Sequence, residues 1–227
     1  MEIGLEINYF VIGLCTHCAS VKDELQVFGS FHDKTEDSWK NKDTDLQDHI
    51  TGVLKNHPKT RHEDIVDSFS WDLHQNQYKY PDIHRKSLII TIFSFLETRL
   101  NELCSILEEC IELKIKRKDL NGRGIERAIS YLKLVAEFDL EPMNKEVFYV
   151  RGVNQVRNQI VHNYGRLPED DKHKACIFVT NVKNLSGAPG GVISVRPDFI
   201  RELLDNLTNF FDKLNAEVQR FIQSKNP

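Results

Sequence analysis

The feature that most constrains this chain is a long apolar stripe with helical spacing in its middle. Between Ile83 and Lys114, large apolar side chains recur every three or four residues. That spacing places them on one face of an α-helix, and the members are Leu88, Ile92, Phe95, Leu96, Leu100, Leu103, Leu107 and Ile111. A stripe of this length must be covered by other elements, so it predicts a helix at the centre of a helical core.

Three further segments carry apolar stripes of the same kind. We expect helices over about Gly124–Glu137, Asn144–Asn163 and Pro197–Gln223. Pro197 suits the first position of a helix, where a missing N–H group loses no partner. Four long helices bury their stripes most simply as a four-helix bundle, so the predicted fold class is all-α, with the bundle over residues 81–227.

A short β-hairpin is expected just before the last of these helices. Cys176–Thr180 and Val192–Val195 are β-prone runs, and Ser186–Gly191 between them has the composition of a loop. The predicted hairpin covers about residues 176–195 and forms a small insertion in the bundle.

Residues 1–80 are predicted to form a helical extension ahead of the bundle. Apolar residues at helical spacing predict helices over about residues 2–28 and Glu63–His74. Residues 32–62 are strongly polar, which fits either two short helices or a mobile surface segment. Pro81 is expected to separate this extension from the bundle.

Charge and hydropathy limit the class of protein. The chain has 30 basic and 34 acidic residues, and a net charge of -4 argues against a protein that coats duplex nucleic acid by bulk charge. The longest apolar run, Tyr9–Cys15, has seven residues, whereas a membrane-spanning helix needs about twenty. We therefore expect no membrane partner. The N-terminus lacks the basic start of a secretory signal, so a cytoplasmic location is expected.

The five cysteines are interpreted as free thiols. Their odd number and the lack of an export signal favour a reducing compartment. Cys15 and Cys18 form a lone Cys-x-x-Cys motif, but no second pair follows to complete a zinc site, and no βαβ pattern surrounds it. We interpret this motif as structural and expect neither a metal ion nor a cofactor.

The segment Arg157-Asn-Gln-Ile-Val-His-Asn-Tyr-Gly165 ends the third predicted core helix. Asn158 and His162 are four residues apart and share a face, whereas Arg157 and His162 lie about 140° apart around the helix. A neutral histidine can take the proton of an RNA 2′-hydroxyl, and an arginine can neutralise charge on the phosphoryl oxygens. Neither role needs a metal ion. The same residues also fit structural roles, with Arg157 and Asn158 at a helix end and His162 packed or at the surface.

This segment resembles the signature of the HEPN superfamily, small helical proteins of bacterial defence and toxin–antitoxin systems. The family pattern is an arginine, then a polar residue that is often asparagine, then a histidine four to six positions after the arginine. These map onto Arg157, Asn158 and His162. The long central helix looks like the first core helix of the family, and Phe199–Val218 is similar to its closing helix. The resemblance covers about residues 83–223.

The resemblance implies a four-helix bundle that dimerises, with both copies of Arg157 and His162 in one cleft at the interface. Many members of the family are metal-independent ribonucleases that leave 2′,3′-cyclic phosphate ends. In that role His162 is the general acid/base, Arg157 stabilises the phosphate, and Asn158 is an orienting residue. The expected function is an endoribonuclease of a toxin or antiviral defence system, with RNA as substrate and an antitoxin or regulatory protein as a partner. Other members have lost activity, so a non-catalytic dimer that binds RNA, a nucleotide or a protein is the alternative.

Other charged and aromatic residues are assigned roles around this motif. Some toxin members carry a tyrosine two residues after the histidine, which a nucleotidyltransferase partner modifies, and Tyr164 matches that spacing. Glu97 on the long helix is either a carboxylate that orients Arg157 or an ordinary surface or capping carboxylate. His84–Lys86 and Lys114–Lys118 can add phosphate contacts, although solvated helix ends are their default interpretation.

Overall fold

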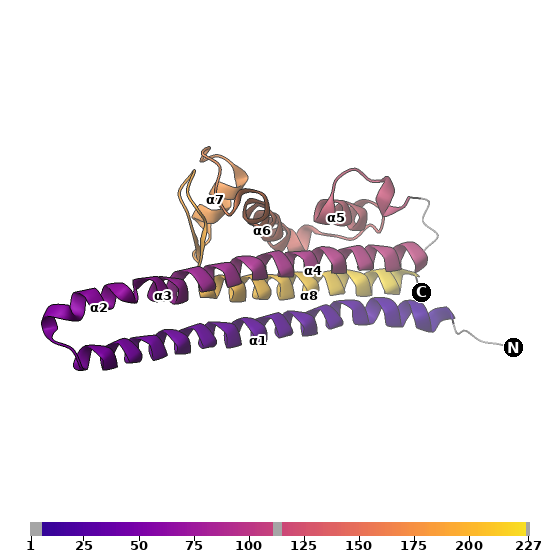
Figure 1. Cartoon of the computed structure of the whole chain (residues 1–227). Coiled ribbons are helices and arrows are strands. Elements are labelled where there is room, and N and C mark those ends of the chain that lie inside the picture. The colour runs from indigo at the N-terminus through magenta and orange to yellow at the C-terminus, as the bar shows by residue number, and fades with distance from the viewer. Residues whose placement is uncertain (1–5, 111–114, 226–227) are drawn as a thin grey trace.

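The computed structural model describes residues 6–110 and 115–225, which are mostly helical (Figure 1). Three long helices run side by side: α1 (Glu6–Lys55), α4 (Tyr80–Cys110) and α8 (Pro197–Lys225). The predicted ends of the first helix at residue 2 and of the central helix at Lys114 lie outside the described residues.

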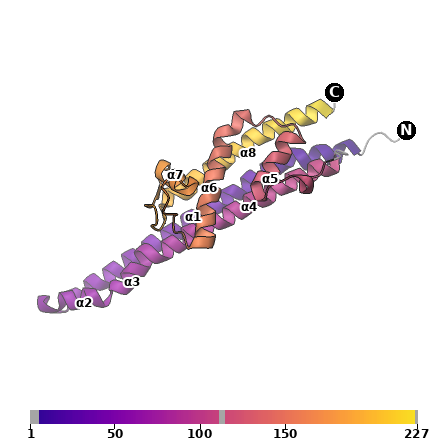
Figure 2. The ribbon, with the colours of Figure 1, turned by 90° about the horizontal axis from the view of Figure 1, so that it is seen from above.

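A second group of elements covers the side of α4 and α8 that faces away from α1 (Figure 1). Its helix α6 crosses both α4 and α8 (Figure 2). The helices of this group are α5 (Gly124–Leu134), α6 (Asn144–Asn163) and α7 (Lys174–Asn181), and the strands are β1 (Leu185–Ser186) and β2 (Ser194–Val195). Single 3₁₀ turns join some elements, namely η1 (Lys59–Arg61), η3 (Arg117–Asp119) and η4 (Glu141–Met143). A mostly helical chain with one antiparallel strand pair before the last helix confirms the predicted all-α class and the presence of a hairpin.

One apolar cluster joins all the long helices. Leu100 and Leu103 of α4 and Phe211 of α8 are completely buried in it. Leu14 and Val21 of α1 are equally buried in the same cluster, so the first half of α1 belongs to the core of the molecule. The division of the chain into a helical extension (residues 1–80) and a bundle (residues 81–227) stays a prediction.

The prediction of short helices or a mobile segment over residues 32–62 is wrong, because α1 continues unbroken to Lys55. No proline interrupts this stretch before Pro58, and the helix ends just ahead of it, as the restricted residue before a proline favours. The side chains on its inner face are partly or fully buried at spacings of three and four. Polar residues interrupt the apolar ones on this face, which hid the pattern: His32, Glu36, Trp39, Asp43, Leu46, Ile50 and Val53.

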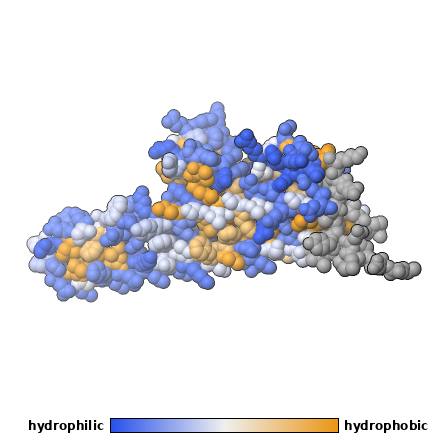
Figure 3. Space-filling model, turned by 45° about the vertical axis from the view of Figure 1, so that its right-hand side comes forward, coloured by the Kyte–Doolittle hydropathy of each residue, from blue (hydrophilic) through white to orange (hydrophobic). Residues whose placement is uncertain are grey.

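Beyond the start of α8, the second half of α1 pairs with a returning helical segment to form a projection that we call the arm, residues 37–79 (Figure 1). The returning segment contains α2 (His62–Ser68), α3 (Ser70–His74) and the π-helical turn η2 (Gln75–Lys79). Apolar side chains gather on the surface at the far end of the arm (Figure 3).

Pro81 does not separate two elements as expected. The N–H of Tyr80 bonds the carbonyl of Gln75, five residues back, and α4 follows directly from this wide turn. Pro81 lies in the first turn of α4, where its lack of an N–H group is tolerated. The helix therefore runs on from the arm into the core.

The assignment of Cys176–Thr180 to a strand is wrong, because this run lies within α7. Short apolar runs fit a strand and a buried helix equally well. Here the side chain of His173 accepts a hydrogen bond from the Ala175 N–H and starts a helix. Cys176 and Val179 are both buried, as expected for one helix face. The hairpin strands are shorter than predicted, and Leu185 of β1 pairs with Val195 of β2.

The close packing of α7 on α6 depends on Gly152. A Cβ atom at this position would overlap the ring of Phe178, which is buried. None of the helices in the described part of the chain is both long enough and apolar enough to cross a membrane.

We predict that Gly152→Ala lowers the free energy of unfolding by about 1–3 kcal/mol, because the Phe178 ring must move to admit the methyl group. The matched control is Gly52→Ala in α1, where nothing lies within 4 Å of the added Cβ. That change should be neutral or stabilise by up to about 1 kcal/mol, as alanine favours a helix over glycine. Urea unfolding followed by circular dichroism measures both, and equal effects would contradict the packing.

Candidate functional site

The predicted motif lies at the end of α6, whose bounds match the predicted helix. Tyr164 ends the helix in the left-handed conformation, with φ of 53°, and the N–H of Gly165 bonds the carbonyl of Gln159. This tight cap places Arg157, Asn158 and His162 on the last two turns of a well-defined helix.

Arg157 is a partly buried cation without a carboxylate partner in the described part of the chain. Its guanidinium lies over the ring of Phe93 in α4, at 5.9 Å from the ring centre, and its Nη1 donates to Oδ1 of Asn158 at 3.1 Å. Its Nε is buried and bonds no atom of the described residues. Arg151, two turns earlier, is instead paired with Glu126 at 2.8 Å. The positive charge of Arg157 is therefore held in place but not neutralised.

His162 is exposed and lies on a different side of α6 from Arg157. No contact between the two side chains is recorded among the described residues, as their separation around the helix implies. The structure thus brings Arg157 and Asn158 together within one chain and leaves His162 apart from them. Tyr164 is 95% exposed, so its side chain is accessible, and its modification stays a prediction.

Glu97 lies on α4 beside the first residue of α5. Its Oε1 is 3.2 Å from where a Cβ of Gly124 would be. A carboxylate near a helix N-terminus is stabilised by the helix dipole. No bond between Glu97 and Arg157 is recorded in the described part of the chain, so its orienting role stays a prediction.

Lys86 brings a second positive charge close to the end of α6. Its Nζ lies 3.5 Å from where a Cβ of Gly165 would be, and it forms an ion pair with Asp82 at 2.7 Å. The carboxylate of Asp82 is 41% exposed, whereas the side chain of Lys86 is only 13% exposed.

A pocket of about 620 Å³ lies next to the motif, between α5, α6 and α7. Arg151 and Gln155 line it, and Asn158 and His162 follow them along α6 at spacings of three and four residues. These four side chains therefore share one face of the helix. The pocket therefore lies along the same face of α6 as His162, although neither Asn158 nor His162 lines it.

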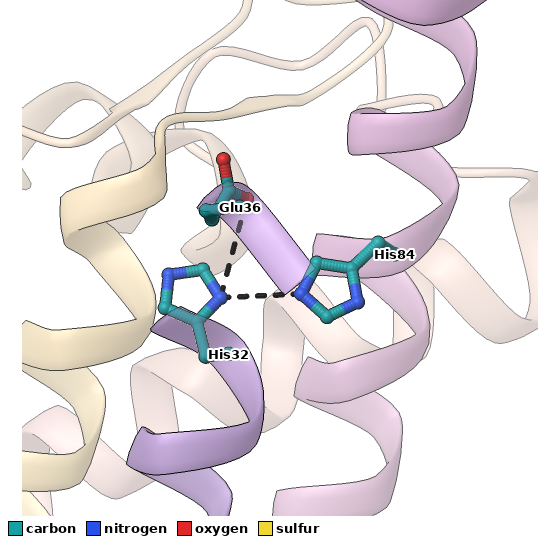
Figure 4. A group of neighbouring side chains, drawn as sticks. All are labelled: His32, Glu36 and His84. Atoms are coloured by element: carbon teal, nitrogen blue, oxygen red, sulfur yellow. Dashed lines mark hydrogen bonds and ion pairs between the residues drawn. The ribbon is translucent and has the colours of Figure 1, made fainter. Parts of the chain in front are cut away.

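A second polar cluster, which sequence analysis did not foresee, lies where the arm leaves the core (Figure 4). It consists of His32 and Glu36 from α1 and His84 from α4. His32 Nδ1 is 3.2 Å from His84 Nε2 and 4.0 Å from Glu36 Oε1. The two imidazole rings stack with centroids 5.5 Å apart. The one signal in the sequence was the four-residue spacing of His32 and Glu36, which places both on one helix face.

Arg85 closes this cluster from the other side. Its Nε and Nη2 donate to the two oxygens of Glu36, both at 2.7 Å, and its Nη1 donates to the Val195 carbonyl at 3.1 Å. The earlier interpretation of Arg85 as part of a solvated helix start is therefore wrong: its side chain is only 17% exposed. It is committed to Glu36 and is not available to a phosphate.

Burial governs the protonation of the cluster. Burial removes water from His32 and His84, and this lowers the pKa of both imidazoles. Neighbouring charges also contribute to each pKa. Burial alone would raise the pKa of Glu36, but the Arg85 fork and the two histidines together hold it below its usual value. At neutral pH the cluster therefore holds an ionised carboxylate and two neutral imidazoles.

The Cys-x-x-Cys motif does not form a reactive site. Cys18 is buried, and this raises the pKa of its thiol to about 12. His17 between the two cysteines bonds the Arg99 carbonyl through Nε2 at 2.9 Å. The cysteines whose side chains the structure describes are unpaired: Cys15, Cys18, Cys104 and Cys176.

Searches of protein-family models, curated proteins and solved structures found no match to this chain.

We predict that Glu36→Ala destabilises the protein by about 3 kcal/mol or more, because it leaves the Arg85 charge buried and unpaired. The control is Asp33→Ala, one turn earlier on the same helix, whose partner Arg201 is 63% exposed. That change should cost less than about 1 kcal/mol. Urea unfolding measures both, and a similar small loss in each variant would contradict a buried ion pair.

We also predict that Cys18 and Cys104 react with a thiol reagent only when the protein unfolds. Raising the pKa of a thiol from 9.0 to about 12 reduces its thiolate fraction at pH 8 about 1000-fold. Alkylation with and without urea, read by peptide mass, measures this. Rapid labelling of Cys18 in the folded protein would show that the motif is reactive after all.

Proposed function

We propose that this protein is a metal-independent endoribonuclease, in line with its resemblance to the HEPN superfamily. The observation that carries the proposal is the guanidinium of Arg157, which is held in place without a carboxylate partner among the described residues, on the same end of α6 as the exposed His162. Toxin or antiviral activity in the cytoplasm, with control by an antitoxin or regulatory protein, is the biological setting that this resemblance suggests.

The charge pattern supports the binding of a phosphate. The guanidinium groups of Arg85 and Arg151 each pair with a carboxylate, whereas among the described residues Arg157 bonds a neutral amide oxygen alone. A phosphodiester oxygen would supply the missing negative charge and an acceptor for the free N–H groups. Lys86 adds a second positive charge near Gly165, at the same end of α6. Asn158 holds the guanidinium in position and is the orienting residue.

His162 is assigned the proton transfers. In its neutral form it accepts the proton of the RNA 2′-hydroxyl as that oxygen attacks the adjacent phosphorus. The bond from phosphorus to the 5′-oxygen breaks, and a protonated imidazole supplies the proton to the leaving oxygen. The products are a 2′,3′-cyclic phosphate and a 5′-hydroxyl. Neither step requires a metal ion.

A homodimer completes this site. Within one chain, the side chains of Arg157 and His162 point to different sides of α6. A second copy that packs against the end of α6 would place its own histidine opposite the arginine, so that one imidazole acts as base and the other as acid. The pocket along the same face of α6 would accommodate the flanking nucleotides.

The test is cleavage of cellular RNA by the purified protein with EDTA present. We predict that His162→Ala and Arg157→Ala each reduce the rate at least about 100-fold, because each removes a group from the transition state. The matched controls are His62→Ala in the arm and Arg201→Ala on α8, and both should retain the rate of the parent protein. The ends of the products are identified by their resistance to phosphatase and by mass.

Two results would overturn the proposal. The first is cleavage that both site variants retain, which would point to a contaminant or another site. The second is a folded, dimeric parent protein that binds RNA and does not cleave it. That result would support the alternative of a non-catalytic binding module.

A further inference from the structure

The cluster of His32, Glu36 and His84 is the strongest feature that the proposed function does not use. Its three donor atoms all lie within 4.8 Å of one another. They come from two helices, α1 and α4, and the cluster lies where α8 begins. In Figure 4 the interactions of Glu36 and His84 meet at one ring nitrogen of His32.

We propose that His32, Glu36 and His84 bind a divalent transition-metal ion, with Zn²⁺ as the best match. The donor set of two imidazole nitrogens and one carboxylate oxygen suits zinc, cobalt or nickel. It does not suit magnesium or calcium, which prefer oxygen ligands alone. The proposal is independent of the ribonuclease motif, whose chemistry needs no metal ion.

The spacing of the two nitrogens fits a tetrahedral ion. Ligands at the usual zinc–nitrogen distance are about 3.3 Å apart in a tetrahedron. His32 Nδ1 and His84 Nε2 are 3.2 Å apart. Glu36 Oε1 lies 4.0 Å from His32 Nδ1, so a shift of less than about 1 Å would bring it to the same spacing.

The hydrogen bond on the far side of His32 fixes the tautomer that ligation needs. Its Nε2 lies 3.0 Å from the carbonyl of Pro197 and must carry the proton, because a carbonyl can only accept. The lone pair of Nδ1 then faces the cluster. Metal-binding histidines commonly show this arrangement, in which a backbone carbonyl orients the ring through its other nitrogen.

Arg85 leaves Glu36 able to bind an ion. The fork of Arg85 uses one lone pair on each carboxylate oxygen, and a carboxylate offers about four acceptor positions. The arginine holds the carboxylate toward the histidines and also opposes the ion by its charge. Three protein ligands leave a fourth position open, on the side where His84 is only partly buried.

The test is a titration of the full-length protein with Zn²⁺ and Co²⁺ against a coloured chelator. We expect one ion per chain, no displacement by equal concentrations of Mg²⁺, and a rise in melting temperature with Zn²⁺. Bound Co²⁺ should show the visible absorption of a tetrahedral site without the ultraviolet band of a thiolate ligand. This spectrum is recorded on the unaltered protein and does not depend on any variant.

Variants locate the site. His84→Gln and His32→Gln should each weaken Zn²⁺ binding at least 10-fold and abolish the rise in melting temperature. Circular dichroism of the metal-free proteins checks that each is folded. Two controls remove other groups with affinity for zinc: Cys15→Ser in the Cys-x-x-Cys motif, and His57→Ala on the surface of the arm. Both should bind as the parent does.

Absence of bound Zn²⁺ in the parent protein would overturn the proposal. So would binding that His84→Gln and His32→Gln retain, since the ion would then be held by surface histidines or by cysteines. Ribonuclease activity in EDTA is a separate measurement, so failure of the metal site and failure of the proposed function are distinguishable.

Discussion

The arrangement of the long helices depends on the guanidinium of Arg85. It lies at a junction where α1, α4, the hairpin and the start of α8 meet. It joins α4 to α1 through Glu36 and to the hairpin through the Val195 carbonyl, and His32 ties α1 to the first residue of α8. Buried polar contacts are directional and costly to leave unpaired, so they fix how these elements meet. The next residue, Lys86, points toward Gly165 and the end of α6. The junction and the proposed ribonuclease site thus share one short stretch of α4.

The fold was predictable where burial is apolar and continuous. The helices α5, α6 and α8 begin at or near the predicted residues, because each has an apolar stripe in the sequence, and Pro197 marks the start of α8. The inner face of α1 beyond residue 31 mixes apolar side chains with polar ones such as His32, Glu36 and Asp43, so its apolar pattern is interrupted. Cys176–Thr180 is too short for its period to distinguish a strand from a helix.

The candidate site was predictable only where its members are neighbours in the sequence. Arg157 and Asn158 are adjacent, and their side chains bond each other. The position of Glu97 beside Gly124 depends on how α4 packs on α5, which no local pattern specifies. The pair His32 and His84 joins positions 52 residues apart, and it required α1 to continue through a stretch for which the sequence left two alternatives.

The arm gives this molecule two levels of stability. Residues 37–55 of α1 extend about 28 Å past the junction at the usual rise of an α-helix. The structure describes residues 37–79 throughout. Among the apolar side chains of this stretch, Ile50 alone is buried. Local opening costs little free energy where few apolar groups are buried. We therefore expect the arm to open locally at a lower free-energy cost than the core.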